Sequence, residues 1–172
     1  MNIFFLSTDP IEAAMMMCDK HLNKMALESM QMLATGARLN GATDDDLLSA
    51  GVVTKAGTPW RSTHQHHPST RWVAASQGNA RWLAVHAEAL CIEHHYRFGT
   101  MPSTLQAIAA FRDSGILSVF PDAPRTAPPQ AMPDDLRGDD TVEAYRRFYH
   151  TKTFAVWAKK RPAPTWWRGV SA

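Results

Sequence analysis

An unbroken run of helix-forming residues near the amino terminus constrains the fold of this chain more than any other feature. Between Pro10 and residue 39 there is no further proline, and Gly36 is the only glycine. Alanine, methionine, leucine, glutamate and lysine recur through the run, and all of them favour helices. Asp9 is a good N-cap and Pro10 suits the first helical position, whereas Asn40-Gly41 is a stop signal. The sequence therefore predicts one long helix over about 10–39 at the centre of an all-α fold.

The rest of the chain alternates between helical and irregular patterns. Apolar residues recur at helical spacing over about 69–98, where Gly99 ends the segment and the internal Gly78 indicates a kink or a close helix contact. Shorter helices are predicted over about 103–113 and 139–160, the last one ending before Arg161-Pro162. The predicted irregular segments are a brief strand or extended lead-in at 3–6, loops with a short capped turn at 43–46 within 41–70, and an extended proline-rich segment at 121–133 that lies over the surface.

Length and composition indicate one globular domain over 1–172. The chain has 172 residues, of which 45% are hydrophobic and 20% charged, and this usage excludes wholesale disorder. Within that domain we expect loop-rich insertions at 41–70 and 115–138 and a tryptophan-rich coda at 161–172. No apolar run reaches the roughly 18 residues of a membrane span, and the first ten residues lack the pattern of a signal peptide. The two cysteines, Cys18 and Cys91, form no disulfide framework, which predicts a reducing, cytoplasmic location.

Positive charge and tryptophan gather at the carboxyl end. No acidic residue follows Glu143, three of the six tryptophans lie in this region, and its last 27 residues carry seven cations: Arg146, Arg147, Lys152, Lys159, Lys160, Arg161 and Arg168. Basic residues interleaved with aromatics suit a polyanion whose bases can stack, which points to nucleic acid. The alternative is a basic amphipathic helix whose tryptophans face the core.

A polar stripe interrupts the apolar background of the first predicted helix. His21, Lys24, Glu28 and Gln31 follow one another at spacings of three or four residues, so they share one helix face. A carboxylate beside cations could act as a general base or stabilise a developing cation. A solvated surface helix would carry the same stripe.

Two histidine-rich segments are candidate metal sites. The segment around 58–72 holds His64, His66 and His67, and a second group comprises Cys91, Glu93, His94 and His95. Neither shows the paired spacing that marks zinc ligands, so we predict no metal and no cofactor. Phosphate contacts from His64, His67 and Arg71, or simple capping and turn hydrogen bonds, explain the first segment better. Common nucleotide-binding and hydrolase motifs do not occur in the chain.

Several short motifs together resemble one family. The run Cys18-Asp19-Lys20-His21-Leu22, followed by Glu28 seven residues after the histidine, resembles the first helix of the pyrimidine-dimer DNA glycosylases, the endonuclease V of T-even phages. In the same order come a helix that begins at His67 and ends in an E-x-x-x-R-F/G pattern at 93–99, then a basic helix, then R-P-A-P-T-W-W at 161–167. The chain is also similar to phage and bacterial proteins that carry C-D-K-H and R-P-x-P-x-W-W motifs.

The resemblance implies a compact all-helical enzyme that binds double-stranded DNA, bends it and flips out a base. It implies that a terminal amine attacks C1′ of the damaged nucleotide to form an imine, with Glu28 as the catalytic glutamate and His21 as the active-site histidine. Because Asn2 is too bulky for methionine removal, either Met1 supplies the amine or the enzyme forms no imine and Glu28 activates water or another nucleophile. Lys24 would replace the family's arginine, whose position here is Leu27. The predicted DNA contacts are His64, His67, Arg71, Lys159, Lys160, Arg161, Trp166, Trp167 and Arg168.

Three functions remain open at this point. The first is a DNA glycosylase with possible abasic-site lyase activity, working as a monomer in the cytoplasm of a bacterium or a phage-infected cell. The second is an enzyme that hypermodifies thymine in phage DNA, or transfers a group to it, with the same flipped-base pocket. The third is a non-catalytic DNA-binding module in which Glu28 only pairs with Lys24. Convergence of Glu28, His21 and Met1 in one place would favour an enzyme.

Overall fold

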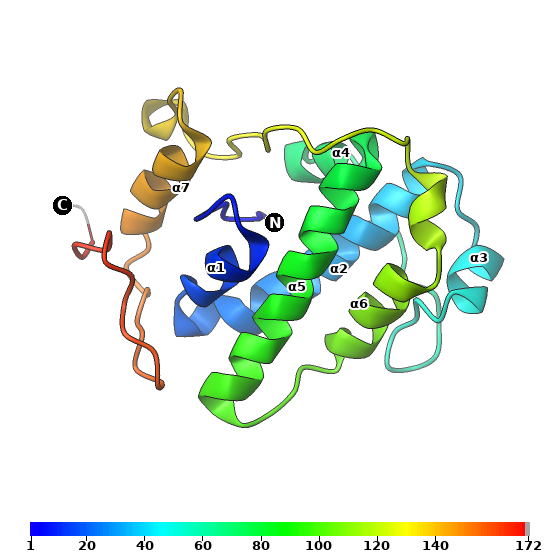
Figure 1. Ribbon diagram of the computed structural model, residues 1–172, viewed down its shortest axis with the longest axis horizontal. Helices are drawn as coiled ribbons and strands as arrows, with labels where there is room; N and C mark the ends of the chain where they lie inside the picture. Colours follow the sequence, from blue (N-terminus) through cyan, green and yellow to red (C-terminus); the bar gives the residue numbers. More distant parts are fainter. Residues whose placement is uncertain (171–172) are drawn as a thin grey trace.

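Helix α2 (Asp19–Leu39) is the central element of the fold, as Figure 1 shows. The computed structural model describes residues 1–170, and the last two residues of the predicted coda, 171–172, lie outside that range. The other helices are α1 (Pro10–Met15), α3 (Asp44–Ser49), α4 (Pro68–Ala75), α5 (Gln77–Phe98), α6 (Thr104–Asp113) and α7 (Thr141–His150), with short 3₁₀ turns η1 (Ile116–Val119) and η2 (Asp134–Leu136). Within 1–170 there is no strand, only an isolated bridge between Val53 and Pro59, so the all-α prediction is confirmed.

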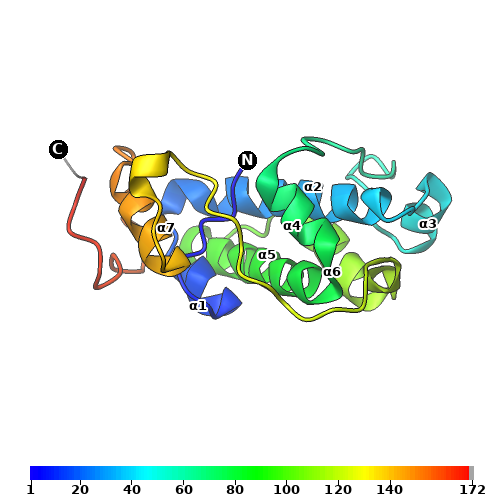
Figure 2. The same ribbon diagram turned by 90° about the horizontal axis from the view of Figure 1, so that it is seen from above.

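The core forms where α2 packs against α4 and α5, with α1 and α6 on either side of α5. One face of α2 is lined by fully buried apolar side chains, among them Leu22, Met25, Met30 and Leu33. Figure 2 shows α1 on one side of α2 and the amino terminus on the other. No helix within the described residues is long and apolar enough to cross a membrane.

The single helix predicted over 10–39 is two helices, because a buried arginine ends the first one. The Arg97 guanidinium donates to the carbonyl oxygens of Met15 at 2.8 Å and Met17 at 2.9 Å. The backbone then turns, and the Cys18 N–H donates to the Tyr149 hydroxyl at 2.9 Å. The predicted start is confirmed, since the Asp9 side chain accepts the N–H groups that open α1. Tertiary hydrogen bonds thus override a favourable local propensity.

The helix predicted over 69–98 is also interrupted, at Ser76, whose backbone is extended and whose hydroxyl caps α5. The interruption is explained by contacts with the proline-rich segment at 121–133, which we name the strap. Carbonyl oxygens of the strap accept the N–H groups of Gln77 at 2.9 Å and Gly78 at 3.1 Å, which would otherwise lack partners at a helix start. Gly78 therefore marks a close approach of the strap backbone rather than a helix contact. Gly99, with φ +75°, ends α5 as predicted.

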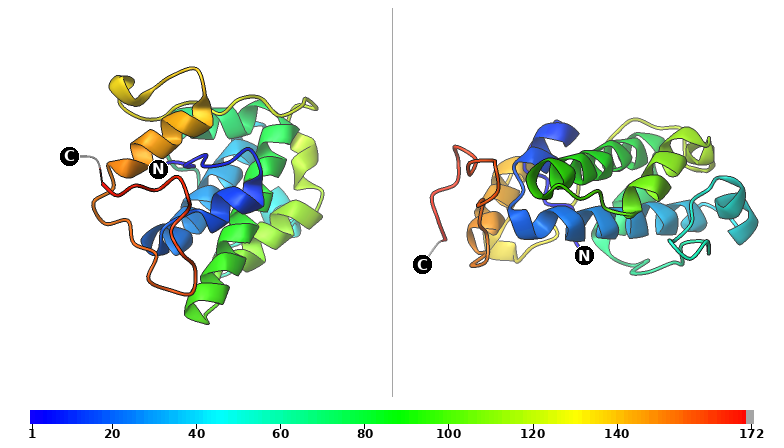
Figure 3. Two further views of the ribbon diagram at one scale, coloured as in Figure 1. Left: turned by 60° about the vertical axis from the view of Figure 1, so that its left-hand side comes forward. Right: turned by 90° about the horizontal axis from the view of Figure 1, so that it is seen from below.

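The last helix is shorter than predicted: α7 ends at His150, and 151–160 form turns. Asp19, at the start of α2, fixes this segment, because its N–H donates to the Val156 carbonyl at 2.9 Å and its carboxylate accepts the Ala158 N–H at 2.8 Å. The views in Figure 3 show the segment after α7 looping back beside α1 and the start of α2. The prediction for 43–46 is confirmed, because Thr43 and Asp46 form a capping box at the start of α3. Residues 3–6 form a lead-in rather than a strand, but the lead-in is not fully extended, because the Leu6 N–H donates to the Phe4 carbonyl oxygen at 2.8 Å.

Candidate amine–carboxylate site

The amino terminus and Glu28 lie together on the side of α2 that faces away from α1. The Met1 amine nitrogen is 3.8 Å from Glu28 Oε2. The same carboxylate accepts the Asn2 N–H at 3.1 Å, and its other oxygen lies 3.1 Å from Lys24 Nζ. The Glu28 side chain is 14% exposed, so it is partly shielded yet reachable from solvent. The 3.8 Å separation is that of an ion pair rather than a hydrogen bond, so the two groups can exchange a proton after closing to about 2.6–3.2 Å or through one water.

The Met1 side chain anchors the amine in place. It is only 2% exposed, it packs against the core, and its sulfur lies 3.6 Å from the Thr70 hydroxyl on α4. The residue as a whole is half-buried, so its exposed part is the backbone end that carries the amine. Burial of the side chain thus presents the amine toward Glu28.

The segment after Met1 connects the two predicted catalytic positions of α2. The Asn2 side chain accepts the N–H groups of Ile3 at 2.8 Å and Phe4 at 3.3 Å. Phe4 has φ +53°, a conformation that a bulky residue adopts only when its surroundings impose it. The Phe4 ring stacks on His21 with a centroid separation of 4.6 Å. The segment therefore runs along α2 from Glu28 to His21.

His21 is buried and forms no hydrogen bond to Glu28. Its Nδ1 lies 2.8 Å from the Tyr149 hydroxyl, which also accepts the Cys18 N–H. A hydroxyl that accepts from Cys18 and donates to Nδ1 satisfies both groups and leaves the imidazole proton on Nε2. Burial, and then the charges of Lys24, Lys152 and Lys20, lower the pKa of His21 to about 4. The ring is therefore neutral near pH 7. Of the three residues whose convergence would favour an enzyme, Met1 and Glu28 lie together beside Lys24, whereas His21 contacts neither of them and is linked to them only through Phe4.

The histidine-rich loop approaches the amine through His67. This residue caps α4, with its Nδ1 accepting the Ser69 N–H at 3.2 Å. Partial burial, then the positive Met1 amine and His64, lower the pKa of His67, while Glu28 opposes the shift. His64, with φ +48°, and Arg71 on α4 are exposed. The structure thus brings the loop predicted to contact phosphates to the edge of the amine–carboxylate site.

The terminal cations occupy a different region, and one of them is already paired. Arg161 forms a two-pronged ion pair with Glu93, which is 4% exposed and also binds Arg97. The guanidinium of Arg161 is therefore committed to a structural contact rather than free for a phosphate. Lys160 lies over the Tyr96 ring at 5.5 Å. Lys159 and Arg168 are exposed.

Trp166 and Trp167 are half-buried against the fold. Trp166 lies edge-on to Tyr149 and its Nε1 donates to the Met16 sulfur at 3.4 Å, while Trp167 stacks on His150 at 4.8 Å. The tryptophans therefore pack against the fold, as in the alternative interpretation, but they lie in a non-helical segment rather than on a basic amphipathic helix. Their packing holds the coda against α1 and α7.

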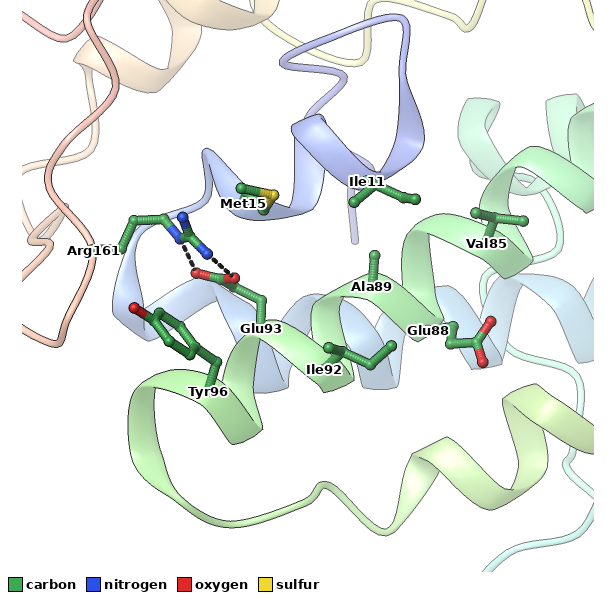
Figure 4. Close-up of a pocket in the computed structure, with 9 residues that line it drawn as sticks. All are labelled: Ile11, Met15, Val85, Glu88, Ala89, Ile92, Glu93, Tyr96 and Arg161. Atoms are coloured by element: carbon green, nitrogen blue, oxygen red, sulfur yellow. Dashed lines mark hydrogen bonds and ion pairs between the residues drawn. The ribbon is translucent and has the colours of Figure 1, made fainter.

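A hollow that is separate from the amine–carboxylate site is mostly apolar. Its volume is about 350 Å³ and it lies between α1 and α5, with the Glu93–Arg161 pair at one end (Figure 4). The Glu93 carboxylate is bound by two guanidinium groups, and Glu88, which also lines the hollow, pairs with Arg112. Among residues 1–170, no three histidine, cysteine or acidic side chains are placed to hold a metal ion.

Several residues of the site have no sequence signal of their own. Tyr149 holds His21 from a position 128 residues away, and Asn2 orients the segment that links Met1 to Phe4. Such roles depend on tertiary contacts that no spacing encodes.

Comparison with protein-family models, with curated proteins and with solved structures found no match to this chain.

Proposed function

We propose that this protein is a base-flipping enzyme that acts on a damaged or modified pyrimidine in double-stranded DNA, through the Met1 amine and Glu28. The proposal depends on one observation, the separation of 3.8 Å between the Met1 nitrogen and Glu28 Oε2. We propose further that the protein works as a monomer in the cytoplasm of a bacterium or a phage-infected cell.

The proposed reaction is a glycosylase step with a lyase step available to it. The free amine attacks C1′, the bond from C1′ to the base breaks, and the base leaves with its electron pair and then takes up a proton. Glu28 accepts a proton from the attacking amine and stabilises positive charge on the sugar. The C1′–O4′ bond then breaks as the nitrogen lone pair forms the C1′=N bond, O4′ takes up a proton and the nitrogen loses its second proton, which gives the imine from which strand cleavage can follow.

Borohydride trapping tests this reaction. The substrates are duplexes that carry an abasic site, a thymine dimer or a hypermodified thymine. We expect a reduced adduct whose attachment maps to the α-amine of Met1. The matched control is the chain with its α-amine acetylated, which should bind DNA but form no adduct. Wild-type turnover of any of these substrates without an adduct would contradict the imine mechanism.

A second candidate is a hypermodification enzyme or transferase, and the position of Glu28 favours it in one respect. The backbone N–H of Asn2, at 3.1 Å, orients the carboxylate independently of the amine. Glu28 could then activate water or another nucleophile. Turnover of the hypermodified thymine by the acetylated chain would select this candidate.

A further inference from the structure

Three lysines on two separate elements form a cationic cluster beside the amine–carboxylate site. Lys20 and Lys24 lie one turn apart on α2, and Lys152 follows the end of α7. Lys20 Nζ is 4.9 Å from the centre of the Phe154 ring, and Lys152 Nζ is 3.4 Å from that of Phe148. We name Lys20, Lys24 and Lys152 the lysine cluster.

The aromatic rings beneath these lysines show that the cluster is one site. Phe154 lies edge-on to His21 at 5.2 Å, and Phe4 lies between His21, at 4.6 Å, and Phe148, at 5.7 Å. The two elements that carry the lysines therefore meet over the His21 ring. Lys24, which contacts Glu28, joins this surface to the amine.

Acidic residues balance only one member of the cluster, since Lys24 pairs with Glu28. Within residues 1–170, Lys20 and Lys152 have no carboxylate within 4.0 Å, and the neighbouring Asp19 is engaged by Arg97. Partial burial, and then the charge of Lys24, lowers the pKa of Lys152 below its usual range. Cations held near one another in this way repel, and a bound anion relieves the repulsion.

We propose that the lysine cluster binds the phosphodiester backbone of the DNA strand that carries the target nucleotide. This inference rests on the proposed function for the identity of the strand. Lysine ammonium groups bind phosphate as point charges, and Phe154, 39% exposed, offers a ring on which a base can stack. The cluster also adjoins the amine. Arg161, by contrast, borders the hollow between α1 and α5 (Figure 4), whereas the amino terminus emerges on the opposite side of α2 from α1 (Figures 2 and 3).

The test is the salt dependence of binding to an undamaged duplex. Log K falls as log salt rises, and each lost phosphate contact reduces the magnitude of this negative slope by about 0.9. Lys20→Gln/Lys152→Gln should therefore reduce the magnitude by about 1.8. Lys152→Arg, which keeps the charge, should retain the wild-type slope. Lys55→Gln, in an exposed loop beyond α3, is the remote control and should also retain it.

Two outcomes would overturn the inference. One is an unchanged slope in Lys20→Gln/Lys152→Gln together with a loss of about 1.8 in Lys159→Gln/Lys160→Gln, which would assign the contacts to the terminal cations. The other is calorimetric binding of pyrophosphate that needs Lys20 and Lys152 while duplex binding does not, which would assign the site to a free phosphate compound. Because the slope requires no reaction, it separates this inference from the borohydride result: either can fail while the other stands.

Discussion

The Met1 nitrogen and Glu28 Oε2 are 3.8 Å apart, while the Met1 side chain is buried against α4. In a chain from which Met1 had been removed, Asn2 would supply the amine. The backbone nitrogen of Asn2 is 3.1 Å from Glu28 Oε2. Glu28 therefore stands beside the first backbone nitrogen of the chain in either processing state. The two states differ in whether the Met1 sulfur contacts the Thr70 hydroxyl.

Glu28→Gln should abolish turnover while leaving folding and DNA affinity nearly intact. The amide keeps the size of the side chain and a hydrogen-bond acceptor but removes the charge that takes up a proton. Loss of a general acid–base group typically lowers the rate by about 10²–10⁴-fold. The lost pair with Lys24 should cost only about 0.5 kcal/mol of stability. Single-turnover rates and urea unfolding measure the two effects, and a wild-type rate on an identified substrate would refute the catalytic role.

Arg97→Met should destabilise the fold strongly. The Arg97 side chain is fully buried, and it binds Glu93, Asp19 and the end of α1. Removing one partner of a buried pair typically costs about 3–5 kcal/mol. Arg161→Met is the matched control, because that side chain is 28% exposed and leaves Arg97 to pair with Glu93. Urea unfolding should show a clearly smaller loss for the control, and equal losses would contradict the central role of Arg97.

Stability should fall as the pH drops from 6.5 toward 4. Burial lowers the pKa of both His21 and His86 to about 4, from an ordinary value of 6.5. The unfolded chain then binds more protons than the folded one between pH 4 and 6.5. The contribution of these histidines to the free energy of unfolding is therefore fully present above pH 6.5 and declines below it. Each histidine contributes up to about 1.4 kcal/mol per pH unit. His86→Gln should flatten the curve of unfolding free energy between pH 6.5 and 5, and an identical slope in the variant would refute this contribution.

Gly78→Ala should displace the strap. A Cβ at this position would lie 2.3 Å from the Arg125 nitrogen and 2.6 Å from the Pro124 carbonyl carbon, both of them backbone atoms. Overpacking of this kind typically costs about 1–3 kcal/mol. At Gly138 a Cβ would instead meet the flexible end of the Arg147 side chain at 2.7 Å. Gly138→Ala should therefore be nearly neutral in thermal unfolding, and a similar loss in both variants would show that the strap is not the cause.

The sequence predicted most of the helical content because local signals were strong where they existed. Asp9 and Thr43 cap helices as their types suggest, and Gly99 ends α5. The errors fall where tertiary hydrogen bonds replace helical ones. Arg97 takes the carbonyl groups that end α1, and the strap takes the amide groups that open α5. Neither partner is visible in a local window.

The candidate site was predictable in part for the same reason. Lys24 and Glu28 are one helical turn apart, so their contact follows from spacing alone. The turn of α2 that buries His21 depends on Tyr149 and Phe4, which pack against it from distant parts of the chain. The charge run at the carboxyl end gave no indication that Arg161 would be used to close an ion pair with Glu93.

The strap is the covalent connection between the helices around α2 and the unit formed by α7 and the coda. Its carbonyl oxygens hold the start of α5, and near its end the Ala131 carbonyl accepts the Asn2 side-chain N–H at 2.8 Å. A single backbone cut at the exposed Arg125 would divide the protein into two fragments, with Glu28 and the amine in one and Ala131, Tyr149 and Lys152 in the other. Reassembly would then become a bimolecular event. The geometry around the amino terminus would then depend on fragment concentration, because the contact between Asn2 and Ala131 joins the two fragments.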